Sequence, residues 1–451
     1  MNLNETKQRE QWGSRIAFIL AAAGSAVGLG NIWRFPYVVG TNGGAAFVII
    51  YLVIIFLIGY PMMITEMTLG RKTHKNAIGA FLSLAPGTPW WITGALGVLA
   101  GFVILSFYSV VAGWAMAFTL KSLTGSLGVG TDFVDAFVGH ITNPTIPLIW
   151  HAIFMAITLT IIGAGVVKGI ERTVKILMPA LFVLLMLLVI RAVTLPGAGA
   201  GIAFYLTPDF SEITARSILG AVGQAFFTLS LGMGCMITYG SYLSDKDEIG
   251  DNAAWVVGLD TGIALLAGFA IFPAVFALGF DPAVGAGLAF ITLPAVFAEM
   301  PGGVLFGTVF FLLLSIAALT SAISLLEVVV AWLVDEKGME RKKASLSVGI
   351  LIFLLGVPAS ISLAEQQFMV FGMPLFDALD LFQESLLLPL GGLLTAIFAG
   401  YVWTAKNTRD HANSVAGKIH VGAWYDVLIK FVVPIAVAVV MVFGWIDIFS
   451  G

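Results

Sequence analysis

An apolar segment near the start of the chain is long enough to cross a bilayer, but it contains residues that interrupt a helix. Residues 24–36 read GSAVGLGNIWRFP, so three glycines and Pro36 accompany the polar side chains of Asn31 and Arg34. Glycine and proline weaken a helix, and non-helical backbone at membrane depth is tolerated only where it lines a cavity within the protein. We therefore predict a discontinuous helix that contributes to a binding site inside the membrane.

The remainder of the chain is also typical of a membrane protein. Of its 451 residues, 59% are hydrophobic and 11% are charged, whereas soluble domains carry about 25% charged residues. A span requires about 20 apolar residues. We predict an all-α integral membrane protein with eleven transmembrane helices in a single domain, residues 1–451. The expected spans are 15–37, 44–69, 90–122, 145–165, 170–192, 215–243, 255–280, 302–334, 344–363, 376–404 and 427–448.

The distribution of Lys and Arg predicts the orientation of the chain. If the N-terminus is cytoplasmic, 18 of the 22 basic residues lie on the cytoplasmic side or flank it. Lys121, Arg191 and Arg216 lie outside, and Arg34 lies within the membrane. Since cytoplasmic loops are enriched in Lys and Arg, we expect a multi-pass protein of the plasma membrane with a cytoplasmic N-terminus. An odd number of spans places the C-terminus outside.

A second glycine-rich interruption suggests an internal repeat. The sixth expected span contains SLGMGC at residues 230–235, five spans after the first interruption. Because five is odd, the second unit runs in the opposite direction through the membrane. Paired interruptions in inverted halves indicate a transporter site near the bilayer midplane, although glycines also simply allow close packing of membrane helices. We expect repeats at about 12–195 and 214–405, followed by an extra helix at 427–448.

Several ionisable residues lie within the expected spans, where each costs several kcal/mol and marks a pathway or a paired network. They are Glu66, Asp260, Glu327, Asp380 and Glu384. We expect Glu66 to accept hydrogen bonds from backbone amides that are freed at a helix interruption. An ion pair between Arg34 and Asp380 would close the external entrance or serve as a static structural contact.

The polar residues suit sodium, a hard cation that prefers oxygen ligands. Unwound backbone supplies carbonyl oxygens, while Asn31, Thr228 and Asp260 supply side-chain oxygens. Thr320 and Ser321 add two hydroxyls, which would alternatively bond back to their own helix. The five histidines have no metal-site spacing and no phosphate-binding loop is present, so we expect neither an enzyme nor an ATP-driven pump. Nothing in the sequence indicates a nucleic-acid partner.

The motifs together resemble the neurotransmitter:sodium symporter family. They are REQW at 9–12, residues 24–36, NGG at 42–44, QAFFTLS at 224–230, ITY at 237–239 and AALTS at 317–321. Eleven spans resemble the bacterial branch. The resemblance implies a 5+5 inverted-repeat fold with helices 1 and 6 unwound at the midplane. It also implies sodium-coupled uptake of hydrophobic (aliphatic or aromatic) L-amino acids by alternating access, with an amino-acid-gated sensor or channel as the alternative.

The same resemblance assigns residues to two sodium sites and a substrate site. The first sodium site would use Ala26, Asn31, Thr228 and Asp260, together with the substrate carboxylate. The second would use Gly24, Val27, Ala317, Thr320 and Ser321. The substrate would contact Ala26, Leu29, Gly30, Ile104, Tyr108, Phe227, Thr228, Ser230, Met233, Ser324 and Leu325.

The resemblance also implies gates and a mobile segment. The external gate would be Arg34 and Asp380, with Phe227 as a lid. The internal gate would comprise Arg9, Asp335, Trp12 and Tyr242. Gly169 and Pro179 resemble a family motif that lets the inner end of the fifth span unwind.

Three residues of this chain refine the expected ligands. Gly28 replaces the acidic residue of monoamine carriers, so the substrate should bring its own carboxylate. Asp260 supplies a fixed negative charge, so chloride should be dispensable. Met233 is pliable and suits a large or variable apolar side chain.

Overall fold

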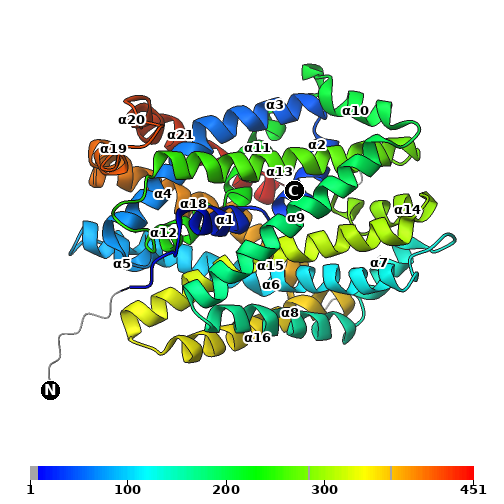
Figure 1. Ribbon diagram of the computed structural model, residues 1–451, viewed down its shortest axis with the longest axis horizontal. Coiled ribbons are helices and arrows are strands. Elements are labelled where there is room, and N and C mark those ends of the chain that lie inside the picture. Colours follow the sequence, from blue (N-terminus) through cyan, green and yellow to red (C-terminus); the bar gives the residue numbers. More distant parts are fainter. Residues whose placement is uncertain (1–8, 283–284, 366–367, 451) are drawn as a thin grey trace.

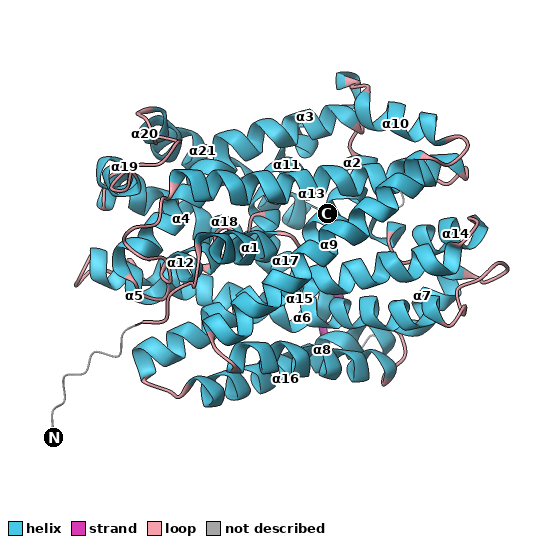
Figure 2. Ribbon diagram, in the orientation of Figure 1, coloured by secondary structure: helices cyan, strands magenta, loops and turns pink. Residues whose placement is uncertain are grey.

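The computed structural model of the protein describes residues 9–282, 285–365 and 368–450. Most of these residues are helical, as Figure 2 shows. Within these ranges, the only strands are β1 (Met369–Val370) and β2 (Met373–Pro374), which form a small antiparallel hairpin. The helical class predicted from the sequence is therefore confirmed.

Most long helices run side by side along the horizontal direction of Figure 1. The segments of the expected spans are α1 (Arg15–Ala26), η1 (Gly30–Arg34), α2 (Phe35–Thr41), α3 (Ala45–Ile54), η2 (Ile55–Gly59), α4 (Tyr60–Thr73), α6 (Trp91–Leu123), α8 (Ile146–Gly163), η3 (Val166–Glu171), α9 (Arg172–Val193), α11 (Ala215–Thr228), α12 (Cys235–Gly240), α13 (Gly250–Ala277), α15 (Gly303–Lys337), α16 (Arg341–Glu365), α17 (Leu375–Phe382), η6 (Gln383–Leu387), α18 (Leu388–Ile397), η7 (Phe398–Val402), α20 (Trp424–Val427), η8 (Leu428–Val432) and α21 (Val433–Ser450). Shorter helices are α5 (Ala77–Leu84), α7 (Phe133–Ile141), α10 (Ala198–Leu206), η4 (Phe210–Glu212), η5 (Gly285–Leu288), α14 (Thr292–Glu299) and α19 (Ala405–Ala412).

The count of apolar helices is close to the prediction. In the part of the chain that the structure describes, nine helical segments are long and apolar enough to cross a membrane. The bent pair Arg15–Ala26 and Gly30–Thr41 makes a tenth candidate. The remaining expected span, 215–243, is divided into α11 and α12 by residues 229–234. A count of eleven spans, the repeat boundaries and the single-domain assignment therefore stay predictions.

Two helix breaks lie near the centre of the molecule. The first separates α1 from η1, and the chain bends there by 51°. The second lies between α11 and α12, where Ser230, Gly232 and Gly234 all have positive φ. A Cβ atom on Gly232 would lie 2.5 Å from the carbonyl oxygen of Leu388, so this break requires glycine for close packing as well as for conformation.

The motif at the start of the fifth expected span is helical here. Gly169 lies in η3, where a Cβ atom would lie 1.9 Å from the carbonyl oxygen of Ile161. Pro179 lies inside α9, which directly follows η3. Pro179 has no N–H and cannot donate the bond of an ordinary helical turn. The unwinding of this segment remains a prediction.

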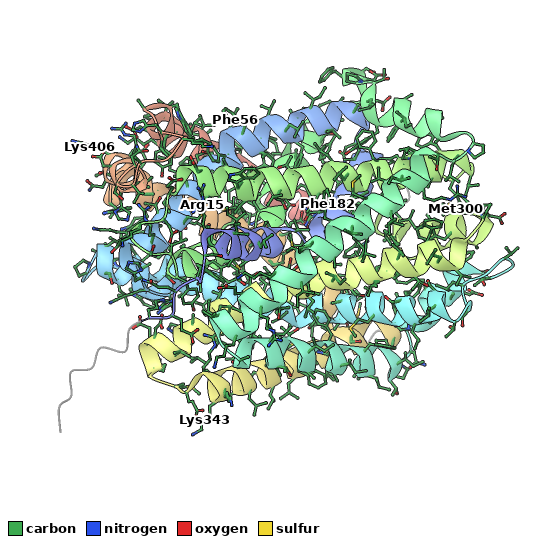
Figure 3. All side chains as sticks on the ribbon, in the orientation of Figure 1. Arg15, Phe56, Phe182, Met300, Lys343 and Lys406 are labelled. Atoms are coloured by element: carbon green, nitrogen blue, oxygen red, sulfur yellow. The ribbon has the colours of Figure 1, made fainter. Side chains whose placement is uncertain are left out.

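Basic residues occur at the end of the molecule that contains the N-terminal segment. Figure 3 labels Lys343 and Lys406 toward the left of the view and Met300 at the right. The left end is the side that the charge distribution predicts to be cytoplasmic.

Close contact between α4 and α12 gives a test of the fold. A Cβ atom on Gly70 would lie 2.0 Å from the carbonyl oxygen of Ile237, which is rigid backbone. We expect Gly70→Ala to destabilise the protein by about 1–3 kcal/mol or more through overpacking. Thermal unfolding of the purified protein in detergent measures this change.

The matched control is Gly262→Ala, since a Cβ atom there meets nothing within 4 Å and Gly262 lies in the long helix α13. Alanine at such a position is favoured over glycine by about 0.5–1 kcal/mol. Equal unfolding temperatures for the two variants would contradict the close packing of α4 on α12.

Candidate functional site

A cavity lies where the two helix breaks approach each other. Its wall combines hydroxyl groups and bare backbone with four large apolar side chains. The lining residues are Ser25, Ala26, Gly28 and Gly30 from the first break, Phe227, Ser230 and Met233 from the second, Ile104 and Tyr108 from α6, and Ser321 and Leu325 from α15. None of these residues carries a charged side chain.

Gly28 allows two polar side chains to reach the first break. A Cβ atom on Gly28 would lie 2.3 Å from Oγ of Ser321 and 2.9 Å from the hydroxyl of Tyr108. The Tyr108 hydroxyl accepts a hydrogen bond from the amide of Leu29 at 3.2 Å. An acidic side chain at position 28 would therefore clash with both polar side chains.

A first cluster of oxygen atoms surrounds the buried carboxylate of Asp260. The amide of Asn31 donates to Asp260 Oδ1 at 2.7 Å, and the hydroxyl of Thr228 donates to the same atom at 3.1 Å. All three side chains are buried. In the described ranges, no Lys or Arg side chain lies within salt-bridge distance of this carboxylate. A buried carboxylate without a cationic partner is costly, so a bound cation would stabilise it.

A second oxygen cluster lies between α1 and α15. The hydroxyl of Thr320 is 3.0 Å from the carbonyl oxygen of Ala317 and 3.3 Å from that of Val27. The hydroxyl of Ser321 is 2.9 Å from the carbonyl oxygen of Ser25 and 3.4 Å from that of Val27. Thr320 thus also bonds to its own helix, whereas Ser321 bonds across to α1. Gly24 lies beside Thr320, since a Cβ atom on Gly24 would lie 3.4 Å from Cβ of Thr320.

Three predicted substrate contacts lie outside the cavity wall. The side chain of Thr228 belongs to the Asp260 cluster, and Leu29 contacts Tyr108 through its amide. Ser324 accepts a hydrogen bond from Ser25 at 2.7 Å, so it lies behind Ser25 rather than in the wall. Sequence reasoning placed Ser324 in the wall and missed Ser25, although Ser25 belongs to the glycine-rich run.

Glu66 supports the second break. One of its carboxylate oxygens accepts a hydrogen bond from the amide of Gly232 at 2.7 Å. The predicted contact with a freed backbone amide is therefore confirmed. The carbonyl oxygen of Gly30, at the other break, accepts a hydrogen bond from Gln224 at 2.9 Å.

The outer side of the cavity corrects one prediction. Arg34 forms its ion pair with Glu384, and the predicted pair with Asp380 is wrong for this structure. Asp380 instead accepts a hydrogen bond from Gln383 at 3.0 Å, while Glu384 lies one turn further along and has a longer side chain. The guanidinium of Arg34 also lies 5.0 Å from the ring centre of Phe227, which lines the cavity.

The four predicted inner-gate residues lie together on the opposite side. Arg9 forms an ion pair with Asp335, and its guanidinium lies 4.6 Å from the ring centre of Tyr242. The indole of Trp12 donates to the carbonyl oxygen of Tyr239 at 3.0 Å. These contacts connect the N-terminal segment to the region around α12 and to the end of α15.

The sequence did not reveal the partners of Glu327. Glu327 is fully buried, pairs with Arg341 and accepts a hydrogen bond from the hydroxyl of Tyr242 at 2.5 Å. Arg341 also donates to the carbonyl oxygen of Ile162 at 2.9 Å. This network lies next to the Arg9 cluster and extends it to α8 and α16.

Comparisons of the sequence and of the fold with known proteins point to the same family. The model of the Sodium:neurotransmitter symporter family matches residues 9–132 and 137–450. The sodium-dependent transporter YhdH of Bacillus subtilis is 44% identical, covering 95% of this chain and 96% of the relative. The human sodium- and chloride-dependent GABA transporter 2 is 29% identical, covering 91% and 76%. The crystal structure of MhsT in complex with L-phenylalanine has a TM-score of 0.89 and 47% identity, covering 96% and 99%.

The hydrogen bond to Gly232 leads to a stability prediction. Glu66→Ala leaves this buried amide without its acceptor and is expected to cost about 1–3 kcal/mol. Glu66→Gln keeps an acceptor oxygen and should retain most of the stability. Thermal unfolding of the two purified variants distinguishes these cases, and equal losses would mean that the hydrogen bond contributes little.

Proposed function

This chain belongs to the sodium:neurotransmitter symporter family, and we propose that it takes up hydrophobic L-amino acids together with Na⁺ by alternating access. The observation that carries this proposal is the cavity at the two breaks, which has an apolar wall and lies beside two clusters of oxygen atoms. MhsT, a similar protein, is in complex with L-phenylalanine. We place the protein in the plasma membrane with its N-terminus in the cytoplasm and its C-terminus outside.

The cavity wall favours a zwitterion with an apolar side chain. Ile104, Phe227, Met233 and Leu325 provide an apolar surface, and the wall offers no charged group to a charged side chain. An unpaired charge there would cost several kcal/mol. The main-chain carboxylate of the substrate would bind near the amides of the first break, and its ammonium group would bind hydroxyl and carbonyl oxygens.

We assign Na⁺ to both oxygen clusters. The first ion would bind Asn31, Thr228 and Asp260 with the Ala26 carbonyl and the substrate carboxylate, which couples ion binding to substrate binding. The second would bind Thr320 and Ser321 with carbonyl oxygens of Gly24, Val27 and Ala317. Each ion would bring α1 together with α13 or α15. Binding that differs between two conformations shifts the population toward the tighter one.

The contacts on either side of the cavity are suited to act as gates. Arg34 with Glu384, and Arg9 with Asp335, both connect segments that are distant in the sequence. During alternating access, the contacts on one side of the cavity would break while the contacts on the other side stay intact. Opening of the inner side would also unwind the segment between Gly169 and Pro179.

Sodium dependence is the direct test. In proteoliposomes with an inward Na⁺ gradient, the protein should accumulate L-phenylalanine or L-leucine, but not L-lysine or dopamine. Asn31→Ala should weaken Na⁺ binding about 5- to 150-fold, since a lost ligand at a buried charge costs about 1–3 kcal/mol. The control Asn407→Ala removes an exposed amide far from the site. Uptake that is equal in Na⁺ and in choline would overturn the proposal.

Chloride should be dispensable because Asp260 is itself a buried anion. Replacement of chloride by gluconate should leave wild-type uptake unchanged, whereas Asp260→Ser should make uptake depend on chloride. Asp245→Ser removes an exposed carboxylate and is the control. If wild-type uptake stops without chloride, the role given to Asp260 is incorrect.

A further inference from the structure

A groove lies on the surface between α8, η3 and α16, away from the central cavity. It has a volume of about 550 Å³, and its lining includes Lys168 and Lys342 as well as Leu159 and Leu346. Figure 1 shows α8 and α16 side by side along the lower edge of the molecule. The groove lies at the end of these helices near Lys343, which Figure 3 labels on the left.

The shape of the groove follows from two glycines. A Cβ atom on Gly349 would lie 2.2 Å from Leu159, so α8 and α16 pack closely at that level. Beyond it, α8 ends at Gly163, and the chain turns through Gly165, which has a φ of 100°, into η3. The turn brings Lys168 to the same groove as the first turn of α16.

The groove carries uncompensated positive charge. Lys168 and Lys342 are exposed, and neither has an ion-pair or hydrogen-bond partner among the residues that the structure describes. Of the acidic residues of the surrounding segments, Glu171 pairs with Lys175 and Glu340 lies 4.0 Å from Lys343, while the charged carboxylate of Glu10 accepts a hydrogen bond from the amide of Val166 and does not line the groove. Among the residues that the structure describes, none that lines the groove is acidic. An anion between the two ammonium groups would therefore be stabilised.

The surface next to the groove is apolar. Ile153 and Ile157 on α8, and Leu346 and Ile350 on α16, are all exposed large hydrophobic residues. In a membrane-spanning protein such side chains contact acyl chains. Paired basic groups beside an apolar helix surface fit a phospholipid better than free phosphate, because the latter has no group to cover the apolar side chains.

We propose that this groove binds the headgroup of an anionic phospholipid from the cytoplasmic leaflet, with the phosphate between Lys168 and Lys342 and an acyl chain along α8 and α16. Basic pockets between membrane helices on the cytoplasmic side are suited to such headgroups. The inference rests on the proposed membrane orientation, but it does not depend on which substrate is transported.

Bound lipid would link η3 to α16, and both elements adjoin the network of Glu327 and Arg341 on the inner side of the cavity. Arg341 at the start of α16 pairs with Glu327 and donates to Ile162 at the end of α8. The carboxylate of Glu10 accepts a hydrogen bond of 2.7 Å from the amide of Val166, which is the first residue of η3. A bridge between Lys168 and Lys342 would thus stabilise the arrangement with the inner side closed and oppose unwinding of η3.

Native mass spectrometry of the full-length protein tests the site. Delipidated protein is titrated with palmitoyl-oleoyl phosphatidylglycerol or phosphatidylcholine, and the affinity of the first bound lipid is compared. We expect phosphatidylglycerol to bind at least about tenfold more tightly. Each lysine is expected to contribute roughly fivefold to the affinity for the anionic lipid. The double variant Lys168→Gln with Lys342→Gln should therefore remove the preference for phosphatidylglycerol. Lys168→Arg with Lys342→Arg should retain it.

The matched control is Lys343→Gln with Lys406→Gln, which removes the same charge from the same end of the molecule. An unchanged preference in the groove variant, or an equal loss in the control, would overturn the site. Competition by glycerol phosphate at the concentration effective for the lipid would overturn its assignment to a phospholipid. Because lipid binding is counted directly, these outcomes are independent of transport.

Hydrogen exchange tests the proposed bridge between η3 and α16. Exchange of the amides of residues 164–171 should slow when phosphatidylglycerol is added to the wild type, but not to the Lys168→Gln, Lys342→Gln variant. No slowing in the wild type would overturn the proposed bridge.

Discussion

The structure depends on how the free backbone groups at the two helix breaks are satisfied. A backbone N–H or C=O group has no water to bond to inside a membrane, so each break must find partners within the protein. Glu66 accepts from Gly232 in the second break, and Gln224 on α11 donates to Gly30 in the first. Ser230 also donates to the carbonyl oxygen of Ser25 at 2.9 Å. Two of these three bonds run between the segments around the two breaks, and the third connects the second break to α4.

The hydrogen bonds between the two breaks explain why the candidate binding groups occur together. Broken backbone exposes carbonyl oxygens and amides, and α6, α13 and α15 add hydroxyl and carboxylate groups to the same place. Gly28 is the residue that permits this convergence, because any side chain there would displace Ser321 or Tyr108. The polarity that is costly in hydrocarbon is thus concentrated where a cation and a zwitterion would bind.

The sequence predicts the features that come from local patterns and from the cost of polar groups in a membrane. The glycine-rich runs predicted both breaks, and the isolated carboxylate of Glu66 predicted its contact with a free amide. The sequence predicts less well which of two neighbouring side chains reaches a given partner. Asp380 and Glu384 lie one turn apart on the same segment, and only packing places Gln383 against Asp380 and leaves Glu384 to Arg34. Ser25 and Ser324 were likewise distinguishable only in three dimensions, because one hydroxyl lies in front of the other.

The two sides of the cavity are closed to different degrees. On the outer side, the side chain of Arg34 is 13% exposed and that of Glu384 is 42% exposed, and Arg34 also lies over the ring of Phe227. On the inner side, Arg9 also bonds Ser241 at 2.8 Å, and the adjacent Glu327 is fully buried with two partners. In this structure the inner side is therefore held by more polar contacts than the outer side. Under the proposed mechanism, Na⁺ and substrate would have to bind the inward-open conformation more tightly to offset the loss of these inner contacts, since a ligand shifts an equilibrium only by its differential affinity for the two states.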